Sequence, residues 1–264
     1  MSEGGVAKAA TLHAESPDGV LIAYRVHGGG TGDSGGGTDA AVPPILLVHG
    51  FASNDQVTWE GTGWVSSLLA AGRTVITLDL RGHGESDKPV GADSYAPELL
   101  GADLRSVLDS AGAERADAIG YSMGNRVISG LTRLAPERLR RVVIGGAGPR
   151  ELFASWDLDD VRAVLLRDEP SRNPVIEQVL RPAIAAGADR EALLACLEGF
   201  AGAPLSIPGD IPTLFVAGEN DSVPEGAQEL AREWGSDFVS IPGRDHVSTL
   251  TARAFKNAAI EFLA

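Results

Sequence analysis

A serine stands between two glycines in the stretch AIGYSMGNRV, residues 118–127. Gly120, Ser122 and Gly124 fit the pattern G-x-S-x-G, in which a strand turns sharply into a helix and holds the serine in a strained backbone conformation. The residues two positions away must then lack side chains, and the hydroxyl is presented in front of the helix N-terminus. The pattern predicts a nucleophile at Ser122.

A serine hydroxyl is a weak nucleophile at neutral pH, so Ser122 needs a base. Of the five histidines, His246 in GRDHVST lies in a loop ahead of the last predicted helix, where an imidazole can reach back over a sheet. His13 and His27 belong to the N-terminal segment and are expected to be surface or strand residues. His49 belongs to a turn that precedes the serine. We therefore predict His246 as the base.

The base needs a carboxylate that fixes its tautomer and stabilises the imidazolium. Asp221 in LFVAGENDSVP follows an apolar strand and precedes a turn. The chain order Ser122, Asp221, His246 is one of the known orders of such triads. Glu219 and Asp245 are the alternatives, but Glu219 is expected to point away and Asp245 is the immediate neighbour of the histidine. We predict Asp221 as the acid.

A developing oxyanion needs preorganised N–H donors. One is expected from Met123, which follows the nucleophile at the helix N-terminus. The second is expected from the stretch LLVHGF, where Gly50 allows a close turn directly after an apolar strand. The backbone N–H groups of Phe51 and Met123 are therefore the predicted oxyanion hole.

These residues lie at the ends of predicted strands and helices. From Pro44 onwards, short and almost continuously apolar runs alternate with helical periods, which is typical of parallel strands buried on both faces. The runs are ILLVHG, TVITLDL, ADAIGY, RVVIGGAG and TLFVAGEND. Helices are predicted over 94–111, with Leu100, Leu104, Val107 and Leu108 on one face, and over 249–264, with Phe255, Ala259 and Phe262 on one face. Residues 11–28 read as a hairpin around Pro17-Asp18-Gly19. The fold class is α/β, with a mostly parallel sheet and helices on both faces.

One region interrupts the alternation. Residues 149–212 contain helical patterns but no convincing strand, so we expect a short helical cap inserted into the α/β core. The expected organisation is a first core segment over 1–148, the cap over 149–212 and a second core segment over 213–264. The glycine-rich stretch 28–41 is expected to be a flexible surface loop, because it lacks the lysine and spacing of a phosphate-binding loop.

Composition narrows the partners. The 264 residues carry a formal net charge of −14, which disfavours nucleic acids and anionic membrane surfaces. A single cysteine, Cys196, and an N-terminus without an apolar signal region make a cytoplasmic location the expectation. No metal-ligand spacing is found, and HGFASN stands where a G-x-G-x-x-G fingerprint would follow the first predicted parallel strand, so no cofactor and no metal are expected. The expected partner is a small molecule; the oligomeric state stays open.

The motifs VHGF, DLRGHGES, GYSMGN, GEND and GRDH occur in an order that resembles the α/β-hydrolase fold superfamily, from about residue 10 to the C-terminus. The chain looks like a small serine carboxylesterase-like member, with both core segments forming the hydrolase domain. The resemblance implies a structural role beside the site for Asp79, Arg81 and His83. Asn125 departs from the second glycine that most relatives carry there. The brief cap favours small or medium acyl groups.

A serine at this position is unlike the dehalogenase and epoxide-hydrolase branches, which use aspartate. The expected reaction is hydrolysis of a carboxylic ester through an acyl-enzyme. A carbon–carbon bond hydrolase, a lactonase or a peracid-forming relative would use the same triad, and some relatives with a retained triad act as small-molecule receptors. The natural substrate, its acyl length and its stereochemistry stay open.

Overall fold

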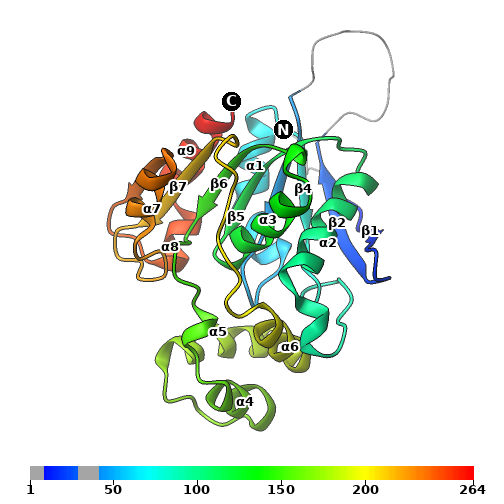
Figure 1. The fold of residues 1–264 in the computed structure, drawn as a ribbon, viewed down its shortest axis with the longest axis vertical. Helices are drawn as coiled ribbons and strands as arrows, with labels where there is room; N and C mark the ends of the chain where they lie inside the picture. Colours follow the sequence, from blue (N-terminus) through cyan, green and yellow to red (C-terminus); the bar gives the residue numbers. More distant parts are fainter. Residues whose placement is uncertain (1–8, 29–41) are drawn as a thin grey trace, which may run out of the picture.

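In the residues that the computed structural model describes, 9–28 and 42–264, eight strands form one sheet in the order β1-β2-β4-β3-β5-β6-β7-β8 (Figure 1). The predicted glycine-rich loop at 28–41 lies outside the described residues, apart from Gly28. The strands are β1 (Leu12–Glu15), β2 (Leu21–His27), β3 (Ile45–Val48), β4 (Val75–Leu78), β5 (Ala116–Tyr121), β6 (Leu139–Gly145), β7 (Thr213–Gly218) and β8 (Asp237–Ile241).

The sheet is parallel from β4 to β8, and β1 and β2 join one edge as an antiparallel hairpin. Every residue of β3, β4, β5 and β7 is buried, because helices cover both faces of a parallel sheet. Successive side chains point to opposite faces: Leu46 and Val48 pack in one core cluster, whereas Ile45 and Leu47 pack in the other. The predicted α/β class and the hairpin are therefore confirmed.

Helices cover the two faces in two sets. On one face lie α2 (Pro97–Ser110), α3 (Met123–Leu134) and α7 (Ala227–Trp234), whose buried side chains belong to the larger core cluster. On the other face lie α1 (Trp64–Ala70) and α9 (Arg253–Leu263), and the short α8 (His246–Thr251) precedes α9. Short helical turns η1 (Gln56–Glu60), η2 (Ala92–Tyr95), η3 (Pro136–Arg138) and η4 (Phe153–Ser155) complete the elements.

Three helices lie between β6 and β7: α4 (Leu158–Arg167), α5 (Pro174–Ala185) and α6 (Arg190–Phe200). Each begins where the side chain of Asp157, Asn173 or Asp189 accepts a hydrogen bond from a free backbone N–H of the first turn. Figure 1 shows these helices grouped apart from the sheet, below its lower edge. We call this stretch of the chain the α4–α6 segment.

Several predicted boundaries are wrong. The helix expected over 94–111 starts at Pro97, because Pro at the first helical position begins a helix but cannot continue one. The helix expected over 249–264 is broken at Ala252, which is extended at φ −67°, ψ 129°. The register of α9 buries Leu263 completely and leaves Phe262 half-buried. Strand β8 and helix α7 were not predicted.

No helix in the described residues is long and apolar enough to span a membrane.

Candidate active site

The turn from β5 to α3 holds Ser122 at φ 52°, ψ −120°, a region that a non-glycine residue occupies at a cost of about 1–3 kcal/mol. Close packing enforces this turn. A Cβ atom added to Gly124 would lie 2.2 Å from the carbonyl oxygen of Val48, and one added to Gly120 would lie 2.5 Å from Asn125 Oδ1. Both glycines are therefore needed for α3 to start this close to the ends of β3 and β5.

The hydrogen bonds of the Asn125 side chain explain why this chain has asparagine at a position where glycine is usual. Its Nδ2 donates to the carbonyl oxygens of Ser122 at 3.0 Å and of Gly145 at 2.9 Å. The backbone N–H of Ser122 also donates to Gly145 O, at 2.9 Å. The side chain of Asn125 therefore fastens the strained turn to the end of β6.

Asp221 and His246 meet beyond the C-terminal ends of β7 and β8, in the segments that follow these strands. His246 Nδ1 lies 2.8 Å from Asp221 Oδ2, and the Asp221 side chain is fully buried. Because a carboxylate only accepts hydrogen bonds, Nδ1 carries the hydrogen and Nε2 is left without one. Asp221 Oδ1 accepts from the N–H of Val223, and the Tyr121 hydroxyl donates to the carbonyl oxygen of His246. Asp221 is thus held at both carboxylate oxygens, and His246 is held at its ring and at its backbone carbonyl.

The other candidates for the acid and the base have other partners. Glu219 is exposed and accepts from the N–H of Gly243. Asp245 caps α8 and accepts from the N–H of Ser248. His13 is exposed on β1.

The end of β6 contacts both the turn that carries the serine and the imidazole. The chain leaves β6 at Gly145, which bonds to the N–H of Ser122, and a Cβ atom on Gly146 would lie 2.9 Å from His246 Cε1. The ring of Tyr121, which directly precedes the serine, lies 5.1 Å from the His246 ring. Ser122 and His246 therefore flank the same short stretch of backbone.

Phe51 and Met123, the predicted oxyanion donors, belong to two segments that meet at Ser122. Gly50 packs against the serine, since a Cβ atom there would lie 3.3 Å from Ser122 Cβ. Within the portion of the chain that the structure describes, neither N–H donates to a protein acceptor. Both remain available to a bound oxygen.

Two enclosed histidines hold the loop that carries Phe51. His49 Nε2 accepts from the N–H of Leu80 at 3.0 Å, so its Nδ1–H donates to Gly50 O at 2.7 Å. His83 Nε2 accepts from the N–H of Ala52 at 3.1 Å. Burial lowers the pKa of His49 to about 4 and that of His83 to about 3, where the neighbouring His49 ring further disfavours a positive charge. Both rings are neutral at pH 7, and their hydrogen bonds fix the backbone of this loop.

The DLRGHGES loop is bound to the core by its own side chains. Arg81 donates to both carboxylate oxygens of buried Asp103, at 2.7 and 2.6 Å, and also pairs with Asp18. Asp79 accepts from the N–H groups of Asp55 and Glu85. The contacts of Asp79, Arg81 and His83 in the described residues are all of this structural kind.

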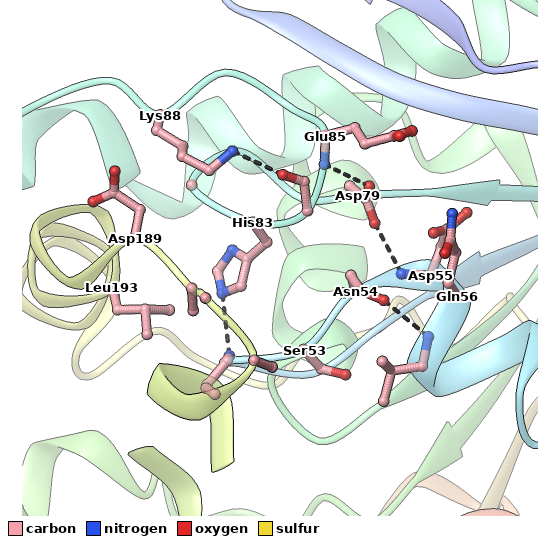
Figure 2. Close-up of a pocket in the computed structure, with 18 of the residues that line it drawn as sticks. Ser53, Asn54, Asp55, Gln56, Asp79, His83, Glu85, Lys88, Asp189 and Leu193 are labelled. Carbon is pink, nitrogen blue, oxygen red and sulfur yellow. Dashed lines mark hydrogen bonds between the residues drawn. The ribbon is translucent and has the colours of Figure 1, made fainter. Parts of the chain in front are cut away.

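Ser122 and Met123 line a small cavity of about 30 Å³, which Leu152 and Phe153 before α4 also line. A larger cavity of about 400 Å³ lies on the other side of Phe51, between residues 52–57, residues 82–88 and the α5–α6 corner (Figure 2). It does not contain the serine. The ring of Phe51 contacts Phe153 at 4.8 Å and His83 at 5.8 Å, so it stands between the two cavities.

Arg126 lines the small cavity with the serine and was not predicted as a site residue. It follows Ser122 by four positions, which places it one helical turn along α3 on the same side. That spacing was the available signal. Among the described residues, no group of three or more His, Cys, Asp or Glu side chains could hold a metal ion.

Comparisons with known proteins agree with this architecture. The profile of the family described as alpha/beta hydrolase fold matches residues 43–169. An uncharacterized protein of Mycobacterium tuberculosis is 37% identical over 139 residues, which cover 52% of this chain and 35% of that protein. A 2-hydroxy-6-oxononadienedioate/2-hydroxy-6-oxononatrienedioate hydrolase of Cupriavidus pinatubonensis is 31% identical over 60% of this chain and 52% of its own. The chain thus spans about half or less of the length of these curated relatives.

Among solved structures, the enol-lactonase of Burkholderia xenovorans superposes with a TM-score of 0.71 at 25% identity, over 96% of this chain and 99% of that one.

Proposed function

Since the chain belongs to the α/β-hydrolase fold superfamily, we propose that it is a serine hydrolase that cleaves a carboxylic ester through an acyl-enzyme. The observation that carries the proposal is the pairing of His246 with fully buried Asp221 beside a serine held at a positive φ. The comparisons support a hydrolase, and cleavage of an ester is what we propose beyond them.

In this mechanism the Ser122 hydroxyl attacks the ester carbonyl carbon while His246 Nε2 takes its proton. Asp221 holds the imidazole in the required tautomer and stabilises the imidazolium. The oxyanion of the tetrahedral intermediate accepts from the N–H groups of Phe51 and Met123, which have no acceptor among the described residues. The imidazolium then protonates the leaving alcohol. Water, activated by the same imidazole, releases the acid and restores the serine.

The small cavity favours substrates with short acyl groups. The cavity of about 30 Å³ is small, since holding one water molecule already takes about 10–15 Å³ of such space. Leu152 and Phe153 line this cavity ahead of α4 and limit the room for a longer acyl chain. Short esters are therefore expected to react faster than long ones.

A lactone or a carbon–carbon bond is the second candidate substrate. One relative is named as a hydrolase of 2-hydroxy-6-oxo dienedioates and one structural neighbour as an enol-lactonase. The same serine, imidazole and oxyanion donors would serve either substrate.

A fluorophosphonate probe and a panel of p-nitrophenyl esters test the proposal. We expect labelling of the wild type and loss of labelling in Ser122→Ala, with kcat for the acetyl ester lowered by about 10⁴ or more. Ser66→Ala, at an exposed serine on α1, is the matched control and should behave as wild type. Undiminished labelling of Ser122→Ala would rule out the mechanism. Serine labelling with negligible turnover of esters, lactones and diketones alike would instead identify a binding protein.

A further inference from the structure

Arg126 is buried without a carboxylate partner. Among the described residues three arginines are buried: Arg25, Arg81 and Arg126, with relative exposures of 1%, 0% and 5%. Arg25 pairs with Asp55 at 2.6 Å, and Arg81 pairs with Asp103 at 2.6 Å. In the described chain no carboxylate forms an ion pair with Arg126. Because a buried charge normally has a counter-ion, this guanidinium differs from the other two.

Backbone carbonyls satisfy only some of the donors of the Arg126 guanidinium. Nη1 donates to Ala203 O at 2.8 Å, and Nη2 donates to Gly148 O at 2.9 Å and to Pro149 O at 3.5 Å. Nε donates to no acceptor in the residues that the structure describes. Burial lowers the pKa of Arg126, and the carboxylate of Glu151 at longer range opposes that shift. Because an arginine side chain stays protonated in proteins, the guanidinium is positively charged, and it has donors to spare.

The Arg126 side chain lines the cavity of the serine. Arg126 and Ser122 line the same cavity, and they lie one turn apart on α3. Glu151 lines this cavity too, but its oxygens already accept from the N–H groups of Phe153, Ala154 and Gly202. Arg150, also at the cavity, pairs at the surface with Glu225. Of these charged groups, Arg126 is the one placed to receive an anion.

We propose that the substrate carries a second, ionised carboxylate, which Arg126 binds while Ser122 attacks the ester carbonyl. The substrate class is the half-ester of a short dicarboxylic acid, or a lactone with an equivalent carboxylate. The inference rests on the proposed function and specifies its substrate. A charge-assisted hydrogen bond in a dry site strengthens binding of such a substrate by about 10- to 100-fold over an uncharged analogue.

Two matched esters test this proposal: monoethyl glutarate and ethyl pentanoate, which differ by a carboxylate in place of a terminal methyl group. Hydrolysis of both is followed by acid release at constant pH. We expect kcat/KM for monoethyl glutarate to exceed that for ethyl pentanoate at least tenfold. Arg126→Met should abolish this preference, and Arg126→Lys should retain some of it. Arg133 is an exposed arginine on the same helix and pairs with Glu98. The control variant Arg133→Met should leave the preference intact.

The ratio of the two rates separates substrate recognition from structure. Loss of the carbonyl contacts in Arg126→Met lowers both rates together, whereas loss of an anion site lowers only that of monoethyl glutarate. A wild-type enzyme that favours ethyl pentanoate, or a ratio that Arg126→Met leaves unchanged, would overturn the inference and leave the serine hydrolase standing. Hydrolysis of both esters by Ser122→Ala would instead overturn the proposed function.

Discussion

The two enclosed histidines of the oxyanion loop should make the protein acid-sensitive. The pKa of His49 is about 4 and that of His83 about 3 in the folded chain, against an ordinary value of 6.5, because burial penalises the charged imidazole. As pH falls below 6.5, the unfolded chain takes up protons that the folded chain refuses. The contribution of these residues to stability is therefore complete above about pH 6.5 and is lost progressively down to about pH 3–4.

The magnitude follows from proton linkage. Between pH 7.5 and 5 each histidine withdraws about 2 kcal/mol from the free energy of unfolding, so the pair withdraws about 4 kcal/mol. The limiting slope is about 1.4 kcal/mol per pH unit for each histidine. Buried Asp55 and Asp103, whose pKa values burial raises, act in the opposite direction. Comparison of a variant with wild type cancels their contribution.

Urea unfolding followed by fluorescence of the four tryptophans, at half-unit steps from pH 7.5 to 5, measures these slopes. His83→Gln lowers the overall stability, but the informative quantity is its slope below pH 6, which should be shallower than that of wild type by about 1.4 kcal/mol per pH unit. His13→Gln, which removes an exposed histidine, is the control and should keep the wild-type slope. An unchanged slope in His83→Gln would refute the assignment of a buried, neutral imidazole.

Three further results are expected. Asp221→Asn should lower kcat by about 10⁴ with little change in KM, because the imidazole loses its orienting acceptor; a variant that retains a tenth of the wild-type rate would contradict the pairing. Gly124→Ala should cost at least about 1–3 kcal/mol in urea unfolding, since its Cβ would lie 2.2 Å from Val48 O, whereas Gly209→Ala, with open space around it, should unfold as wild type does. Cys196, whose pKa burial raises to about 12, should resist a thiol reagent in the native protein and react in urea; fast stoichiometric labelling without urea would argue against its burial.

The features that sequence could predict are those carried by side chains at strand ends. The apolar runs of β3, β4, β5 and β7 are continuous because both of their faces are covered, which makes them easy to identify. The positions of Ser122, Asp221 and His246 follow from short motifs after such runs. Where the turn leaves no room for Cβ atoms, glycine is required, so the glycines of the motif indicate the turn geometry from the sequence alone.

The features that sequence could not predict depend on partial burial or on backbone atoms. Strand β8 lies at the sheet edge, where only Ile241 is buried and no apolar run forms. No proline or glycine in the sequence marks the break between α8 and α9 at Ala252. The hydrogen-bond acceptors of Arg126 are the carbonyl oxygens of Gly148, Pro149 and Ala203, which any residue type supplies. A list of residue types contains no trace of such partners.

The bonds of Arg126 also bear on how this architecture accommodates new specificities. Gly148 O and Ala203 O both accept from one planar guanidinium, so the segment between them begins and ends across a gap a few ångströms wide. Any segment inserted between Gly148 and Ala203 has to close only that gap. The entropic penalty of closing it grows slowly with the length of the segment. Chimeras that exchange residues 150–202 for the corresponding segment of a relative should therefore keep the sheet and the serine turn while changing the molecules admitted.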